Sequence, residues 1–171
     1  MNTTPIEIDH AAARRMWNDY ARARPERAAS DSELVVEHFG DTPRLADELL
    51  DAVASGAKRA TSALVREFTV VGDPLPRIGA HWIACDGRGT PRVVLRTTEL
   101  RIGDFSSVDE RFAADEGEGD RTIENWRDGH RRYFSRISSA WPTPWTESDD
   151  IVFERFRIVW PPDLADADGT A

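Results

Sequence analysis

The sequence predicts an α+β domain in which helices surround a small set of strands. Three stretches place apolar residues at helical spacing, and they start near Asp9, Thr42 and Ile123. Two further stretches, residues 80–85 and 92–100, are joined by an Asp-Gly turn that is typical of a β-hairpin. Amphipathic helices beside a hairpin define the α+β class.

Length and charge limit the function classes. The 171 residues fit one domain with a real core. The net charge of −9, from 31 acidic and 22 basic side chains, opposes broad attraction to nucleic acid or anionic membranes, so any RNA contact has to be local. The single Cys85 excludes an internal disulfide and a Cys-based zinc cluster, and it is interpreted as a small core residue.

Nothing in the sequence predicts a membrane or secretory segment. No apolar stretch approaches the roughly 20 residues of a transmembrane helix. The first ten residues lack the basic start and apolar run of a signal peptide. We therefore expect a cytoplasmic protein.

Residues 1–33 are expected to form an N-terminal helical extension. Asp9 can cap a helix that ends before Pro25. Trp17 and Tyr20 lie at helical spacing on its apolar face, a pattern that favours packing in the core over stacking on a base.

The main domain is expected over residues 34–160. After a short apolar segment, Thr42 is the predicted N-cap of the next helix, with Pro43 at its first position. Gly56 then ends this helix in a left-handed turn.

Later elements are separated by turn and cap signals. Residues 70–79 form a loop because of their Gly and Pro content. Ser107 is predicted to open a short helix through a capping box with Glu110. An acidic, glycine-punctuated loop follows over residues 115–120.

The last third of the chain predicts one helix and one strand. The helix from Ile123 carries His130 on its apolar face, and the WPTPW segment at 141–145 is expected to be a loop. Alternation predicts a strand at Ile151–Trp160. The polar, acidic residues 161–171 are expected to be a disordered tail.

Lys58 is the single lysine among 22 cationic side chains. A buried lysine can exchange a proton near neutral pH, whereas arginine stays charged and presents a planar fork. Lys58 also follows a helix C-terminus, where unpaired carbonyls favour a cation. We interpret it as a functional residue, the alternative being a lone lysine on a solvated surface.

The chain turns into a strand beyond Lys58. Alternation places Lys58 and Ser62 on one face, and Arg59 and Thr61 on the other. A bulge or tight bend is therefore needed if Lys58 and Thr61 are to converge.

A lysine, a hydroxyl and a carboxylate can activate a hydroxyl or water for attack on an acyl carbon. The acidic loop can supply the carboxylate, and His130 is either a core residue or part of the site. The loop could instead be plainly solvated, or hold a divalent cation through Glu116, Glu118 and Asp120, although it does not match the calcium-loop pattern. No cofactor motif is present, so we expect no cofactor, with a divalent metal only for ribonuclease chemistry.

Five separated motifs resemble the ASCH domain family in its longer bacterial form with N-terminal helices. They are FGD at 39–41, ADELL at 46–50, SGAKRAT at 55–61, EGEGDRTIENWRDGH at 116–130 and FERFRIV at 153–159. The resemblance implies a small PUA-like β-barrel flanked by helices.

The resemblance also implies site residues. In similar short bacterial enzymes, a Lys and a Thr of a G-x-K-x-x-T turn act with a Glu from a later acidic segment. This carries over to catalytic Lys58, Thr61 and Glu116, with Glu118 as the alternative carboxylate. Substrate contacts are expected from Ser62, Arg59, Glu118, Trp126 and His130.

Three functions follow from the resemblance. The first is hydrolysis of the amide of an N-acylated cytidine. The second is binding or metal-assisted cleavage of single-stranded RNA. In it, phosphates are bound by Lys58, Arg59 and Arg66, and bases stack on Trp126 or Tyr133. The third is a regulatory nucleotide-binding domain without turnover. The expected partner is therefore a modified nucleoside or single-stranded RNA, with no membrane and no broad DNA binding.

Overall fold

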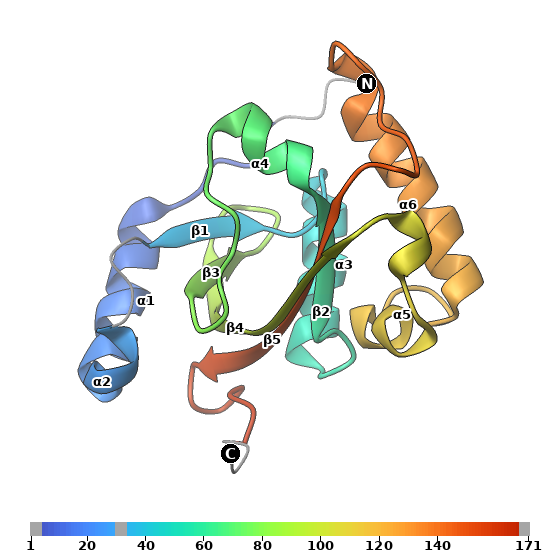
Figure 1. The fold of residues 1–171 in the computed structure, drawn as a ribbon. Helices are drawn as coiled ribbons and strands as arrows, with labels where there is room; N and C mark the ends of the chain where they lie inside the picture. The colour runs from blue at the N-terminus through green and yellow to red at the C-terminus, as the bar shows by residue number, and fades with distance from the viewer. Residues whose placement is uncertain (1–4, 30–33, 168–171) are drawn as a thin grey trace.

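A curled five-stranded sheet forms the centre of the computed structural model, which describes residues 5–29 and 34–167 (Figure 1). The strand order is β1-β3-β4-β5-β2. β1 runs parallel to β3, and the other neighbours are antiparallel. The strands are β1 Val35–His38, β2 Ala60–Leu64, β3 His81–Cys85, β4 Pro91–Gly103 and β5 Ile151–Trp160.

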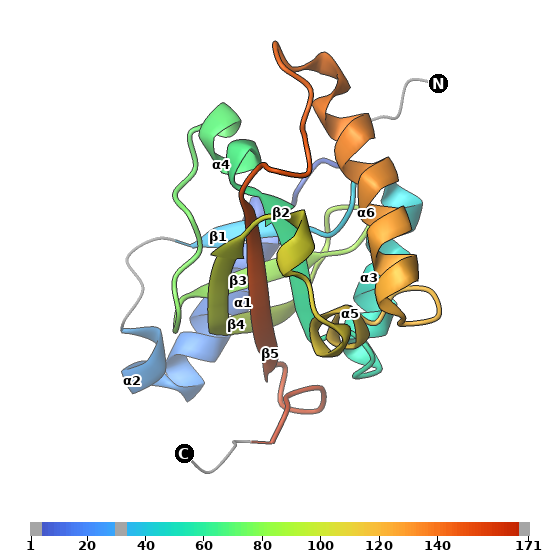
Figure 2. The same cartoon turned by 45° about the vertical axis from the view of Figure 1, so that its right-hand side comes forward.

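Helices flank this half-barrel, as the α+β prediction requires. Figures 1 and 2 show α5 and α6 together beside β2, and α1 and α2 at the opposite side of the sheet. Within the described part of the chain, no helix is long and apolar enough to cross a bilayer. The α-helices are α1 His10–Ala23, α2 Pro25–Ala28, α3 Pro43–Ala54, α4 Val65–Val71, α5 Glu110–Glu116 and α6 Ile123–Ile137.

The predicted N-terminal helix packs into the core of the sheet. Asp9 caps α1 by accepting a hydrogen bond from the Ala12 amide at 2.8 Å. Tyr20 is fully buried, and its hydroxyl lies 2.9 Å from His81 Nε2 on β3. Cys85 is buried in the same cluster, as expected of a small core residue. Residues 5–29 are thus a structural part of the domain.

The predicted signals of the second helix are confirmed in α3. The Thr42 hydroxyl accepts a hydrogen bond from the Leu45 amide at 3.2 Å, and Pro43 is the first helical residue. Gly56 follows the helix with a φ of +88°, the left-handed conformation that a glycine adopts without strain. This turn delivers the chain to Lys58.

Two local predictions were wrong. Val65–Val71 forms the short helix α4, where an extended segment after Lys58 and a loop from residue 70 were predicted. The N-cap of α5 is Asp109, which accepts from the Phe112 amide at 2.7 Å. Ser107 instead closes the 3-10 turn Phe105–Ser107, and its hydroxyl donates to Asp104.

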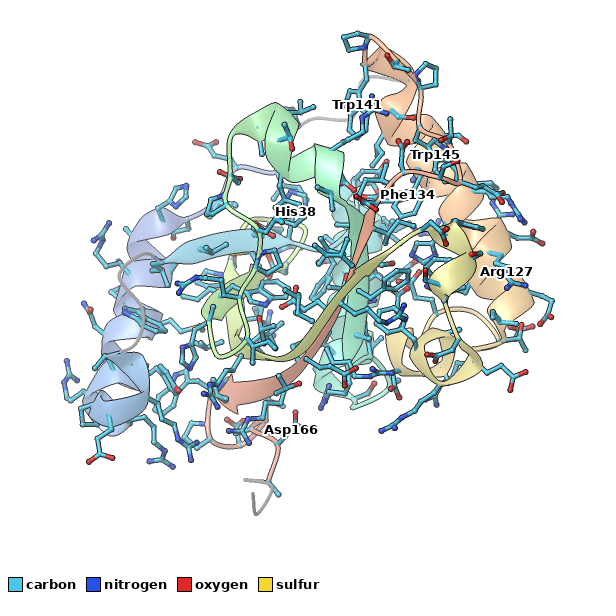
Figure 3. The ribbon with its side chains drawn as sticks, viewed as in Figure 1. His38, Arg127, Phe134, Trp141, Trp145 and Asp166 are labelled. Carbon is cyan, nitrogen blue, oxygen red and sulfur yellow. The ribbon has the colours of Figure 1, made fainter. Side chains whose placement is uncertain are left out.

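The segment after β5 is ordered through residue 167, in contrast to the disordered tail that was expected from residue 161. Asp166 accepts a hydrogen bond from the Ile158 amide at 2.8 Å and pairs with Arg59 at 2.7 Å. Figure 3 shows Asp166 close to the end of β5. Residues 168–171 lie outside the described residues.

An aromatic cluster joins α6 to the sheet. Trp126 is 4% exposed, and its ring centroid lies 5.2 Å from that of Phe105 and 6.1 Å from that of Phe153 on β5. The WPTPW loop closes over this cluster, with Trp145 5.3 Å from Phe134 of α6 (Figure 3). The packing fixes α6 against β2 and β5.

Replacing Trp126 by alanine should therefore destabilise the protein. Loss of a buried indole from a packed cluster costs about 3–5 kcal/mol. Urea unfolding would measure the change, with the partly buried Trp141→Ala as the matched control that should lose less. Equal stabilities of the two variants would contradict this description of the core.

Candidate active site

The backbone around Lys58 is joined to the end of α5. The Lys58 amide donates to the Ala52 carbonyl of α3 at 2.9 Å, and the Arg59 amide donates to the Asp115 carbonyl at 2.7 Å. Gly117 has a φ of +69°, and a Cβ there would collide with the Ala57 carbonyl. A glycine at this position therefore allows the two segments to touch.

Lys58 is buried, with an exposed fraction of 1%. Its Nζ donates to Glu118 Oε1 at 2.9 Å and to the Glu116 backbone carbonyl at 3.3 Å. The ammonium also lies 5.5 Å from the centroid of the Phe39 ring. A buried ammonium requires such partners, because an unpaired charge is strongly disfavoured away from water.

Both oxygens of the buried Glu116 carboxylate are occupied. Ser62 Oγ donates to Oε1 at 2.6 Å, Trp126 Nε1 donates to Oε2 at 2.8 Å, and His130 Nε2 lies 3.2 Å from Oε2. Burial raises the pKa of Glu116, but the charges of His130 and Lys58, together with the hydrogen bonds, hold it below its usual value. Glu116 is the last residue of α5 and not part of a loop.

His130 completes this buried cluster from α6. Its Nδ1 lies 2.9 Å from the Trp126 carbonyl, which only accepts, so Nδ1 carries a proton. Nε2 lies 3.0 Å from Ser62 Oγ as well as close to Glu116. Burial lowers the pKa of His130, but Glu116 outweighs it and raises the pKa above its usual value. The geometry fits an imidazolium that donates from both ring nitrogens.

A cleft of about 450 Å³ opens beside these groups. Among the predicted site residues, those that line it are Thr61, Ser62, Glu116, Glu118, His130 and Tyr133. This volume suits a small-molecule ligand.

Thr61 and Ser62 line the cleft from the edge strand β2, whereas Lys58 is not among the lining residues and reaches the cleft only through its hydrogen bond to Glu118. β2 pairs with β5 without a bulge from Ala60 to Leu64, so Thr61 and Ser62 point to opposite faces. Ser62 reaches Glu116, while the Lys58 ammonium lies over the Phe39 ring and meets Glu118. Within the described residues, the Lys58 ammonium makes its hydrogen bonds to the α5 end and none to Thr61.

Three of the predicted contacts lie away from the cleft. Arg59 donates to the Val53 and Lys58 carbonyls and pairs with Asp166, since it points toward the C-terminal segment. Trp126 is a core residue that holds Glu116. Asp120 accepts from Thr122 at the start of α6, so it does not join Glu116 and Glu118 in one site. The described residues contain no group of three His, Cys, Asp or Glu side chains that could hold a metal ion.

Sequence reasoning missed one buried carboxyl of the cleft. Glu154 of β5 is 7% exposed and accepts a hydrogen bond from Thr97 Oγ1 of β4 at 2.5 Å. Burial raises its pKa to about 7. The available signal was its alternation with Val152 and Phe156, which places an acid on the apolar face of the last strand.

The curled sheet, the flanking helices and the cleft between them define an α+β domain of the PUA-like type. The model of the ASCH domain matches residues 15–160, so the chain belongs to the ASCH domain family. This match includes most of α1.

Two solved structures are similar over most of this chain. The ASCH domain from Lactobacillus crispatus JV V101 is 24% identical, with a TM-score of 0.82 over 89% of this chain and 96% of that chain. Protein EF3133 from Enterococcus faecalis V583 is 25% identical, with a TM-score of 0.76 over 87% of this chain and 88% of that chain. No curated protein matched the sequence.

The His130 and Glu116 pair should make stability depend on pH. The raised pKa of His130 stabilises the fold below the pKa of an unfolded histidine, and this contribution is lost as the pH rises through the folded pKa. His130→Gln keeps a donor near Glu116 but removes the charge. The wild type should melt at a higher temperature than the variant, and this difference should be larger at pH 6 than at pH 9. Each kcal/mol of unfolding free energy that the charge contributes corresponds to about 2–4 °C. A pH-independent difference would show that His130 is neutral in the folded protein.

Proposed function

We propose that the protein is a hydrolase that cleaves the amide of an acylated nucleoside, most simply an N-acylated cytidine. The observation that carries this proposal is the buried Lys58 ammonium paired with Glu118, at a cleft that Glu118 and Thr61 both line. A carboxylate and a hydroxyl that line the same cleft can both reach a ligand bound in it, an arrangement that supports acyl transfer with proton transfer. The cleft volume of about 450 Å³ is compatible with one nucleoside.

In the proposed reaction the Thr61 hydroxyl attacks the acyl carbon. The Glu118 carboxylate takes the hydroxyl proton and gives it to the amide nitrogen as the carbon–nitrogen bond breaks, which releases the free amine and leaves an ester on Thr61. Water then attacks the ester carbonyl, Glu118 takes the water proton and returns it to Thr61, and the carboxylic acid leaves. Lys58 holds Glu118 in place through its hydrogen bond to Oε1.

Glu118 suits this role better than Glu116. Both oxygens of Glu116 already accept hydrogen bonds, and its lowered pKa opposes proton acceptance. The side chain of Glu118 is 36% exposed, and among the described residues its one hydrogen bond is to Lys58. We therefore place proton transfer on Glu118 and assign Glu116 to holding Ser62 and His130.

Glu118→Gln should abolish most turnover without unfolding the protein. Glutamine keeps the size and the contact with Lys58 but cannot accept a proton, so the rate should fall by about two to four powers of ten. Chromatography of N-acetylcytidine hydrolysis, with and without EDTA, would measure it. Glu116→Gln is the matched comparison, and it should lower the melting temperature because it disturbs a buried ionic cluster. Full activity of Glu118→Gln would refute the assignment.

A second function is supported by two arginines. Arg77 and Arg132 both line the cleft and are exposed, and no ion pair engages either one among the described residues. Two available guanidinium groups suit phosphate oxygens, which favours single-stranded RNA as an alternative ligand. Arg66, by contrast, is engaged by Asp149 at 2.9 Å and by the Thr143 carbonyl.

Salt dependence separates the two functions. If RNA phosphates are bound, the affinity for a labelled single strand should fall with a log–log slope of about 0.7 for each phosphate neutralised. Arg77→Gln together with Arg132→Gln should then flatten this slope. Hydrolysis of an uncharged nucleoside should change little over the same salt range, so a steep slope without nucleoside turnover would favour the RNA function.

A further inference from the structure

We propose that Glu154 is a substrate-binding residue that recognises the amino-bearing edge of a nucleobase in the cleft. The inference rests on the proposed nucleoside substrate and names the group that selects its base. It predicts that cytidine, with an exocyclic amino group, binds better than uridine, which has a carbonyl oxygen at the same place.

The Glu154 carboxyl is held in one orientation. It lines the cleft from β5, and Thr97 Oγ1 donates to its Oε1. The buried indole N–H of Trp82 approaches the carboxyl closely enough to lower its pKa slightly, but it completes no hydrogen bond. In the described structure Thr97 is therefore its one hydrogen-bond donor, and acceptor capacity remains for a ligand.

Burial of this carboxyl is not explained by an ion pair. Burial itself is the largest cause of its raised pKa, and the charged neighbour that contributes is another acid, Glu37 of β1. No cationic side chain contributes to lowering it. A buried acid without a cation does not stabilise a fold, and an apolar residue would serve better in a strand between Phe153 and Phe156. A ligand that donates a hydrogen bond accounts for it.

The register places this carboxyl beside the proposed nucleophile. Thr61 of β2 is the direct partner of Glu154 in the antiparallel pair. Side chains of directly opposed residues share a face, with Cβ atoms about 4.5–5.5 Å apart. An acylated amino group keeps one N–H, and a ligand that donates it to Glu154 brings its acyl carbon close to Thr61.

The neighbouring walls suit a planar ring. Phe39 and Trp82 line the cleft and pack edge-to-face on each other, with ring centroids 5.2 Å apart. Aromatic side chains bind bases by stacking, without selecting among them. Selection therefore falls to the carboxylate, which accepts a hydrogen bond from the amino group of cytosine.

Nucleoside binding tests this inference separately from turnover. Titration calorimetry at pH 8, where a carboxyl of pKa about 7 is ionised, would compare cytidine with uridine. The wild type should prefer cytidine by about tenfold. In Glu154→Gln the amide oxygen takes the Thr97 hydrogen bond and the amide N–H₂ faces the ligand, so the preference should disappear or reverse. Glu124→Gln, an exposed glutamate of α6, is the control that should keep it.

The outcomes separate the two proposals. Cytidine preference lost in Glu154→Gln supports the inference, even if the wild type hydrolyses no acylated nucleoside and the proposed function fails. Unchanged preference in a folded Glu154→Gln protein, or binding of neither nucleoside by the wild type, overturns the inference. If Glu154→Gln does not fold, Thr97→Val provides the test, because it frees Oε1 from Thr97 and should weaken cytidine binding at least threefold. Unchanged binding in that variant also overturns the inference.

Discussion

Burial of one ammonium group organises the site. Lys58 is 1% exposed. Its ammonium donates to the Glu116 carbonyl and to the Glu118 carboxylate, which lie 58 and 60 residues further along the chain. Backbone hydrogen bonds join the same turn to α3 and to Asp115. Because an unpaired buried charge is so costly, the positions of α3, β2 and α5 depend on one another. The wall of the cleft that carries Glu118 is part of this arrangement.

Three of the five glutamates that line the cleft differ through their surroundings. Glu116 is saturated with donors and has a lowered pKa, whereas Glu154 lacks a cation and has a raised one. Glu118 is partly exposed beside Lys58. Environments that separate carboxyl groups in this way allow one residue type to hold structure, transfer protons and bind ligand in a single site. The proposed division of roles follows from these surroundings.

Caps and apolar alternation in the sequence predicted those helices and strands whose formation depends on neighbouring residues. The caps of α1 and α3 and the bounds of β5 agree with the structure, because capping and alternation depend on residues a few positions apart. α4 was missed because its β-branched residues do not favour a helix, whereas its first turn is stabilised by the Glu67 carboxylate, which accepts from the Leu64 amide at 2.7 Å. The final segment was expected to be disordered because its composition conceals the pairing of Asp166 with Arg59.

By itself the sequence determined the α+β class and the family and drew attention to Lys58, since these depend on periodicity, motifs and one unusual residue. Only the tertiary structure decided which side chains face the cleft. Glu116 and Glu118 are two residues apart and indistinguishable by composition, yet one ends a helix against α6 and the other meets Lys58. The orientations of the Glu154 and Arg59 side chains likewise depend on Thr97 and Asp166, which lie 57 and 107 residues away from them in the sequence. A linear pattern does not encode such distant contacts, because they arise only when the strands and helices pack together.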